Sequence, residues 1–546
     1  MPLVLRHRGD LPPLDSFDCW LSLGTAPVAL PDSKRVADLE RTLERMFVSV
    51  IESWFDLARV MGRETSAIFA HTTSCTANSS DLGVMFAFAK MADEFAMSPA
   101  VTLAVCDDPW LFRHLQGRPG VVAGRKPSLW FAESRLRFRG LLARSRAAMR
   151  VAYSAVRLRH QRRRMSPSAS YLLVYGHPGS TPEGYDGYFN DLMRRLPALK
   201  RMLHVDCDLN WASHLSRDGR TFSLHAFGNP FFALCLPFQK WKPQRVLRDG
   251  PHHWLIRRAA AREGGTGSGA MIAWQLHCQQ RWLRSALPAV IAWPWENHGW
   301  ERQFVRDARQ YSVRTIGYQH ATVGLQINQS PRSAPDGELC LPDEILCNGQ
   351  SGLEQLEQLG IPSKKLTIGG ALRTPKVSPP PYDASAPVFI ASPFDAAIGR
   401  QIIEACRTSR DRKFVVKQHP MFPFDFKSDG TICETKMPLA EQPAVSAVIF
   451  AATTVGLEAW LGGLPTIRFL PEGRLALNIL PLSLNVPCAT AYDLAETLDR
   501  TRPHVPPTIE HFFAPVDLDV WRSRLGNLDY DPPVTDDQVT ETTRSA

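Results

Sequence analysis

The sequence has none of the cysteine patterns that mark a metal-bound or disulfide-bonded scaffold. Its 11 cysteines are scattered over 546 residues, without a C-x-x-C pair and without Cys and His at metal-ligand spacing. We therefore expect reduced thiols in a cytoplasmic protein that has no structural zinc.

Signals for export and for membrane spanning are also missing. Residues 1–13 contain charged side chains, among them Arg6 and Asp10, and lack an apolar core, so no signal peptide is predicted. The most conspicuous apolar stretch, residues 230–238, is far too short to cross a bilayer.

The net charge of the chain, +9, is unevenly spread, and one segment has no acidic residues at all. Residues 135–164 hold 11 arginines and no acid, and the rest of the chain is slightly acidic. Because the basicity is confined to one segment, no nucleic-acid partner is expected. Phe138, Leu142 and Met149 recur at roughly helical spacing, which is typical of a basic amphipathic helix on an anionic membrane. A solvated helical hairpin or linker is the alternative.

The remaining composition is that of a globular protein with 44% hydrophobic residues, long enough for two or three domains. Apolar strand-like runs alternate with helical patterns, which predicts an α/β fold of two Rossmann-type parallel-sheet domains. The expected boundaries are an N-terminal domain at 1–373 with a basic helical insertion at 134–166, a proline-rich linker at 374–387, a C-terminal domain at 388–505, and a segment at 506–546 whose tail from 530 is disordered.

One stretch, residues 446–471, predicts a strand, a turn, a helix and a second strand. The turn ends in Thr453 and Thr454, and the helix that follows stops at Gly462. Hydroxyls and free N–H groups at the start of a helix suit an anion such as a phosphate. The alternative is an ordinary helix start with Thr454 as its N-cap.

A second stretch, KFVVKQHP at 413–420, predicts a strand that ends in polar residues. Lys417 offers a point charge, His419 a directional donor, and Pro420 stiffens the turn that holds them. Ligands of open parallel sheets bind beyond the carboxyl ends of the strands. The two stretches therefore predict one site for an anionic ligand.

Two consecutive strands of the N-terminal half also end in reactive side chains. Glu296 follows a strand at 289–293, and His320 follows a strand at 315–318, so the two should lie close together. Glu296 is the first candidate for a general base and His320 the second. A structural carboxylate that caps the next helix is the alternative for Glu296.

Further candidates follow other strands. His177 and Asp186 come after a strand at 171–175, and Arg373 ends the turn after a strand at 365–368. Asp206-Cys207-Asp208 has the spacing of a metal-binding carboxylate pair, although its position is not convincing and no metal is expected.

Several segments resemble bacterial surface-carbohydrate biosynthesis proteins of the GT-B glycosyltransferase type. They are WPWENHGWER at 293–302, GYQHAT at 317–322, CNGQSGLEQLEQLGIP at 347–362, GGALR at 369–373, and a YFNDL segment after the Arg-rich insertion. The resemblance covers about 100–480 and implies a GT-B-like fold, with an N-terminal acceptor domain and a C-terminal nucleotide-sugar-binding domain that face a cleft.

The KQHP and ATT segments are similar to the HP and Ser/Thr motifs of bacterial sialyltransferases, polysialyltransferases and capsule Kdo transferases. This similarity implies that Lys417, His419 and Pro420 contact the phosphate of a CMP-sugar and that Thr453 and Thr454 complete the cradle. Glu458, one turn into the helix, would bind the nucleotide ribose; the alternative is an acid placed near the helix N-terminus by the helix dipole. Thr-Thr stands where Ser-Ser or Ser-Thr is commoner, and similar motifs in enzymes that use CDP-glycerol leave the donor open.

The resemblance implies a metal-independent glycosyltransferase for capsule or lipopolysaccharide, without a cofactor beyond its nucleotide-sugar co-substrate. The acceptor would be a glycan or a lipid-linked glycan, and the protein would lie at the inner face of the bacterial inner membrane through residues 135–164. Three alternatives stay open: a CDP-glycerol-type glycerophosphotransferase, a nucleotide-sugar 2-epimerase and a non-catalytic assembly scaffold.

Overall fold

The structure is a computed structural model of the whole chain. It describes residues 3–77, 79–244, 247, 249–373, 378–409, 411–420 and 422–526. The predicted disordered tail from residue 530, and residues 374–377 of the predicted linker, lie outside the described residues.

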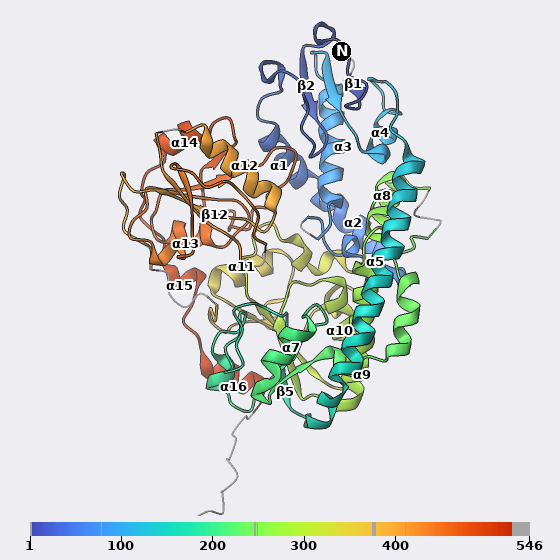
Figure 1. Cartoon of the computed structure of the whole chain (residues 1–546), viewed down its shortest axis with the longest axis vertical. Coiled ribbons are helices and arrows are strands. Elements are labelled where there is room, and N and C mark those ends of the chain that lie inside the picture. Colours follow the sequence, from blue (N-terminus) through green and yellow to red (C-terminus); the bar gives the residue numbers. More distant parts are fainter. Residues whose placement is uncertain are drawn as a thin grey trace, which may run out of the picture.

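The described residues form three parallel β-sheets, each accompanied by helices (Figure 1). The first sheet has the strand order β2-β3-β1-β4 and is built entirely from the first quarter of the chain. Its elements are β1 (Leu3–Arg6), β2 (Cys19–Ser22), β3 (Thr102–Val105), β4 (Val121–Ala123), α1 (Leu39–Ser49), α2 (Ile51–Gly62), α3 (Leu82–Ala96) and α4 (Pro109–Leu115).

The second sheet has seven strands in the order β7-β6-β5-β8-β9-β10-β11. Counted along the chain, this is 3-2-1-4-5-6-7, the order of a doubly wound Rossmann-type sheet. The strands are β5 (Ser170–Val174), β6 (Lys200–Leu203), β7 (Thr221–Ser223), β8 (Val290–Pro294), β9 (Arg314–Gln319), β10 (Glu344–Cys347) and β11 (Leu366–Ile368). The helices of this part are α6 (Leu192–Arg195), α7 (Leu209–Leu215), α9 (Ser268–Ala286), α10 (Gly299–Gln310) and α11 (Gln350–Gln358), whereas α8 (His253–Gly264) packs in the core of the first sheet.

The third sheet repeats this plan with the order β14-β13-β12-β15-β16-β17, which is 3-2-1-4-5-6 along the chain. Its strands are β12 (Val388–Ala391), β13 (Phe414–Lys417), β14 (Ile432–Thr435), β15 (Val448–Phe450), β16 (Thr466–Phe469) and β17 (Cys488–Ala489). The helices of this part are α12 (Ala396–Arg407), α13 (Val455–Leu461), α14 (Leu494–Arg500) and α15 (Ile509–Phe512), while the last helix, α16 (Leu518–Leu525), packs on the seven-stranded sheet. The predicted class, α/β with Rossmann-type parallel sheets, is confirmed.

The N-terminal half, predicted as one Rossmann-type domain at 1–373, is more complex than that. It contains two sheets, and each has a hydrophobic core of its own. The strand β5 is buried on both faces, and its sequence is accordingly a continuous apolar run. Only the pairing of such runs in space decides how many sheets they form.

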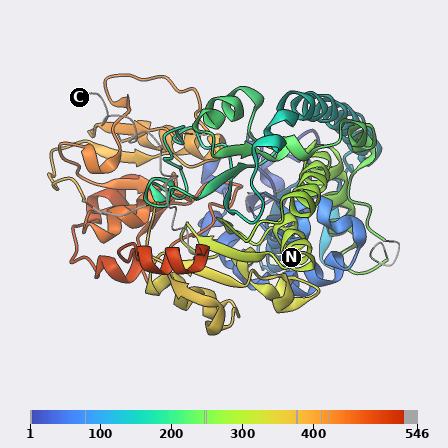
Figure 2. The ribbon, with the colours of Figure 1, turned by 90° about the horizontal axis from the view of Figure 1, so that it is seen from below.

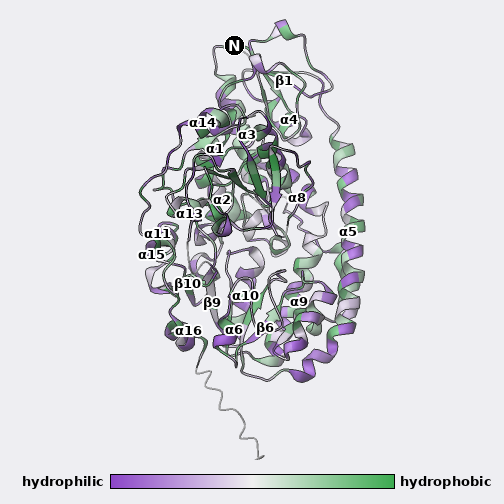
Figure 3. Cartoon of the chain, turned by 60° about the vertical axis from the view of Figure 1, so that its left-hand side comes forward, coloured by the Kyte–Doolittle hydropathy of each residue, from purple (hydrophilic) through white to green (hydrophobic). Residues whose placement is uncertain are grey.

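The predicted basic insertion is a single long helix, α5 (Leu129–Leu158), continued by a 3₁₀ turn at Arg159–Arg164. Its 30 residues give a length of about 45 Å, and it stands along the outside of the molecule (Figures 1 and 3). Gly140 permits this position, because a Cβ there would lie 1.9 Å from the carbonyl oxygen of Gly264 at the end of α8. The alternative of a helical hairpin is wrong.

The C-terminal segment returns to the seven-stranded sheet (Figures 1 and 2). Trp521 of α16 is fully buried, and its Nε1 donates a hydrogen bond of 2.9 Å to the carbonyl oxygen of Gly369. Ser170 Oγ donates to the carbonyl oxygen of Leu525 over 2.6 Å. The two Rossmann-type sheets are thus joined twice, at 373–388 and by α16.

Candidate active site

Strand order places a crevice at the same point in both Rossmann-type sheets. In such sheets the ligand site lies beyond the carboxyl ends of strands 1 and 4, where the winding direction reverses. In the seven-stranded sheet these strands are β5 and β8, which are followed by His177 and Glu296. In the six-stranded sheet they are β12 and β15, and Thr453 and Thr454 follow β15.

Glu296 lies between two histidines. Its Oε2 is 2.7 Å from His298 Nε2, and its Oε1 is 3.7 Å from His320 Nε2. Burial by itself raises the pKa of Glu296, but the hydrogen bond with His298 and the charges of His298, His320 and Arg373 outweigh it and lower the pKa to about 2. The Glu296 carboxyl is therefore an anion at every physiological pH, and the neighbourhood of Glu296 and His320 expected from the sequence is present.

The helix cap belongs to a different carboxylate, Glu301. Glu301 Oε2 accepts hydrogen bonds from Trp293 Nε1 and from the backbone N–H groups of Glu296 and Asn297, at 2.9, 3.0 and 3.1 Å. Its Oε1 accepts from the backbone N–H of His298. Since Glu301 holds the first turn of α10, the capping alternative for Glu296 is wrong, and the Glu296 carboxylate faces the histidines.

The two histidines differ in their protonation. Burial and the charge of Arg373 outweigh the attraction of Glu296 at His320 and lower its pKa to about 4. At His298 the hydrogen bond and the charge of Glu296 outweigh burial and raise the pKa. The pKa values of the two imidazoles are therefore shifted in opposite directions, that of His320 down and that of His298 up.

The charge of Arg373 changes the pKa of groups on both Rossmann-type sheets. Its charge lowers the pKa of His177, Glu296 and His320 on the seven-stranded sheet. It also lowers the pKa of two groups of the six-stranded sheet, which are discussed below. The charge of one guanidinium is therefore felt by titratable groups of both sheets.

The chain shape fixes Arg373 in this place. Gly370, three residues earlier, has φ +82°, and a Cβ there would lie 2.2 Å from the carbonyl oxygen of Pro515. Asn190 Nδ2 donates a hydrogen bond of 2.8 Å to the carbonyl oxygen of Leu372. The Arg373 guanidinium lies 5.6 Å from the ring centre of Tyr188, in a cation–π contact.

Tyr188 also connects the imidazoles of the site. Its ring centre lies 5.5 Å from that of His177 and 5.4 Å from that of His320, edge-on in both cases. Burial and the charge of Arg373 lower the pKa of His177, although Asp186 opposes them. His177, Tyr188, His320 and Arg373 thus form one contiguous cluster.

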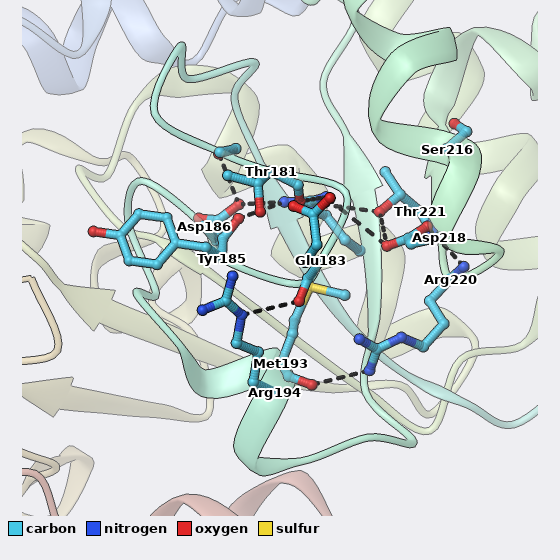
Figure 4. Close-up of polar contacts among 12 residues, drawn as sticks. Thr181, Glu183, Tyr185, Asp186, Met193, Arg194, Ser216, Asp218, Arg220 and Thr221 are labelled. Carbon is cyan, nitrogen blue, oxygen red and sulfur yellow. Dashed lines mark hydrogen bonds and ion pairs between the residues drawn. The ribbon is translucent and has the colours of Figure 1, made fainter.

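Asp186 does not join this cluster as a reactive group. Its carboxylate is fully buried with the guanidinium of Arg201, 3.4 Å away, and accepts backbone hydrogen bonds from Tyr188 and Phe189. Figure 4 shows Asp186 beside Thr181 and Tyr185 of the same loop. Both charges are compensated inside the fold. Asp186, one of the further candidates from the sequence, therefore shapes the loop that presents Tyr188, and its carboxylate is engaged by Arg201.

The six-stranded sheet contributes Lys417, the last residue of β13, followed by the half-buried His419 and the exposed Pro420. Burial lowers the pKa of His419, and the charges of Arg373 and His177 lower it further. His419 thus lies within electrostatic reach of the other sheet, on the side where the sequence predicts a phosphate.

The threonine turn lies at the crevice of the six-stranded sheet. Thr454 occupies the N-cap position of α13, as the alternative expected, but its side chain makes no capping hydrogen bond. One turn further, burial raises the pKa of Glu458 to about 7, and Arg373 offsets only part of this rise. Thr453, Thr454 and Glu458 are half-buried.

The two carboxyls of Asp206-Cys207-Asp208 have different surroundings. Asp208 caps α7 by accepting hydrogen bonds from the backbone N–H groups of Asn210 and Trp211. Burial raises the pKa of Asp206 to about 6. Within the described parts of the chain, no group of three or more His, Cys, Asp or Glu side chains is arranged to hold a metal ion.

Two cavities border the site without enclosing Glu296 or His419. The larger, about 810 Å³, lies between the first sheet and the six-stranded sheet and reaches His71, Phe394 and Ala452. The other, about 500 Å³, lies beside α9 and α10. The ring centre of His71 is 6.1 Å from that of His298, so the larger cavity adjoins the Glu296 cluster at one end and the threonine turn at the other.

Sequence reasoning missed three residues at the candidate site, His298, His71 and Tyr188. His298 stands within the WPWENHGWER segment, two residues after Glu296, and Tyr188 begins YFNDL. Both therefore carried a local signal. His71 is 227 positions before His298, and nothing in the sequence links the two.

No protein-family model and no curated protein matches this sequence. Among solved structures, the chain is similar to UDP-GlcNAc 2-epimerase from Methanocaldococcus jannaschii, with 11% identity, a TM-score of 0.37, and coverage of 66% of this chain and 100% of that one. It is also similar to the lipopolysaccharide outer core galactosyltransferase WaaB, with 12% identity, a TM-score of 0.30, and coverage of 63% of this chain and 97% of that one. A third similar structure is Anabaena HepE in complex with UDP and glucose, with 10% identity, a TM-score of 0.33, and coverage of 65% of this chain and 95% of that one. At these scores the likeness says nothing of this chain's activity.

Proposed function

We propose that the protein is a metal-independent glycosyltransferase of bacterial surface-polysaccharide biosynthesis that uses a nucleotide sugar, with a CMP-linked donor favoured. The observation that carries the proposal is the position of Arg373. One guanidinium acts on Glu296 and His320 of the seven-stranded sheet and on His419 and Glu458 of the six-stranded sheet. A cation whose charge acts on groups at the carboxyl-end edges of both sheets suits a phosphate that bridges them.

The donor would lie on the six-stranded sheet. Lys417, His419 and the hydroxyls of Thr453 and Thr454 would hold the phosphate, because cations and hydroxyl donors complement phosphate oxygens. Glu458 would accept a hydrogen bond from the ribose. The similarity of these segments to CMP-sugar transferase motifs favours cytidine as the base.

The acceptor would lie against the seven-stranded sheet. Its hydroxyl would approach Glu296 and His320, which carry one negative charge and can accept one proton. The acceptor oxygen bonds to the anomeric carbon, the bond from that carbon to the phosphate oxygen breaks, and the hydroxyl proton passes to the Glu296–His320 pair. Arg373, Lys417 and His419 stabilise the negative charge of the departing nucleotide. His177 would border the acceptor through Tyr188.

Calorimetric titration with CMP, CDP, UDP and GDP tests this proposal. Selective binding of cytidine nucleotides is expected, and His419→Ala should weaken it at least about tenfold through loss of a charge-assisted hydrogen bond. His511→Ala, an exposed histidine of α15, is the matched control and should bind like the wild type. Preference for UDP or GDP would reject the CMP donor, and absence of binding to all four would reject the enzyme in favour of an assembly scaffold.

A further inference from the structure

The helix α5 has two apolar faces, although a helix on a protein surface ordinarily needs one. Its inner face, with Ala147, Val151, Ala155 and Leu158, is buried in the core of the seven-stranded sheet. Intervals of three, four and seven residues place a second set on the opposite face. The exposed set is Phe131, Phe138, Leu142, Met149, Tyr153 and Val156.

A second element beside α5 also carries exposed apolar side chains. The 3₁₀ helix η8 (Pro230–Phe238) packs along α5, and Arg144 of α5 donates a hydrogen bond of 2.8 Å from Nε to the carbonyl oxygen of Pro237. The side chains of Phe231, Leu234 and Phe238 are exposed by 79%, 74% and 71%. We call the exposed apolar residues of α5 and η8 together the α5–η8 surface.

The charge around this surface has one sign. Arg135, Arg146 and Arg157 are exposed on α5 close to the apolar stripe. The single acid of α5, Glu133, is only 12% exposed and pairs with Arg257 over 2.7 Å. An apolar stripe flanked by cations alone complements a surface that is apolar inside and anionic outside.

We propose that the α5–η8 surface docks this protein on an anionic lipid bilayer, with α5 lying parallel to the membrane plane. The Phe, Leu and Met side chains would enter the boundary between headgroups and acyl chains, and the arginine stems would reach the lipid phosphates. A straight helix of about 45 Å on the outside of the molecule suits a flat partner. This goes beyond residues 135–164, because η8 supplies much of the apolar contact.

The same helix borders the larger cavity. Ala132, Arg135, Leu136 and Arg139 of α5 line the space of about 810 Å³ that reaches Ala452, next to the threonine turn. If the proposed transferase function holds, a lipid-linked acceptor would enter the cavity from the bilayer past Arg135 and Arg139.

Vesicle co-sedimentation of the full chain tests the docking. Wild-type protein should bind vesicles of phosphatidylcholine with one third phosphatidylglycerol, and bind pure phosphatidylcholine far less. The variants Phe138→Ser/Met149→Ser and Phe231→Ser/Leu234→Ser should each reduce binding at least about tenfold, because they remove large apolar side chains from the lipid boundary.

A charge variant and a matched control separate the causes. Arg146→Gln/Arg157→Gln should reduce binding to the anionic vesicles by about tenfold or more, and raised salt should have the same effect on the wild type. Met97→Ser/Leu482→Ser removes two exposed apolar residues from other elements and should bind like the wild type.

Two results would overturn the docking. One is equal binding of wild type and both apolar double variants. The other is a wild type that ignores anionic vesicles but forms a dimer that Phe138→Ser/Met149→Ser dissociates, which would make the surface an interface between copies. The assay measures lipid binding alone, so its result is independent of the nucleotide titration that tests the transferase.

Discussion

Glu458 makes the ligand-free protein less stable as the pH rises, and this can be measured. Burial raises the pKa of its carboxyl from 4.5 to about 7 in the folded protein. Between these pH values the folded state binds more protons than the unfolded state, so stability is lost as the pH rises through this window. At roughly 1.4 kcal/mol for each pKa unit, the loss above pH 7 amounts to about 3 kcal/mol.

The substitution Glu458→Gln removes the ionisation and preserves the size of the side chain. At pH 5 the free energies of unfolding of the variant and the wild type should differ little. When the pH is raised to 8, that of the variant should become about 2–3 kcal/mol larger than that of the wild type. Urea denaturation at both pH values measures the difference.

The exposed Glu434 of β14 supplies the control, since Glu434→Gln removes a carboxylate of the same sheet. It should show no such gain. An equal advantage of Glu458→Gln at pH 5 and pH 8, or a loss at pH 8, would refute the view that burial makes the ionised Glu458 costly.

Three further substitutions examine the site and its support. Glu296→Gln should lower kcat by about 10²–10⁴-fold and leave nucleotide affinity unchanged, because the carboxylate is proposed to act on the acceptor; full activity in steady-state kinetics would contradict this. Arg373→Ala should raise the pKa of the cluster histidines in an NMR titration, since its charge lowers them in the wild type, and unchanged titrations would disprove the central position of Arg373. Arg201→Ala should cost about 3–5 kcal/mol in urea denaturation, because it leaves Asp186 buried without its cation. A cost under about 1 kcal/mol would show that Asp186 relaxes to solvent.

The local pattern was informative wherever a strand ended in a polar residue. Lys417 ends β13 and Glu296 follows β8 as expected, because buried parallel strands read as apolar runs and their carboxyl ends are marked by the first polar residue. For Asp186 the local pattern was not enough, because it did not show the partner of the carboxylate. Its partner Arg201 is 15 positions away on β6, and only the folded chain shows the ion pair that engages its carboxylate.

The sequence by itself determined the α/β class, the helical nature of the Arg-rich segment, and most of the side chains at the crevice edges. These features depend on neighbours within a few residues, through periodicity, strand composition and turn chemistry. The tertiary structure alone decided that the N-terminal half makes two sheets, that Arg373 lies between groups from both Rossmann-type sheets, and that η8 lies beside α5. Each of these depends on contacts between residues far apart in the sequence, where many arrangements satisfy the same local preferences and only packing of the whole chain selects one.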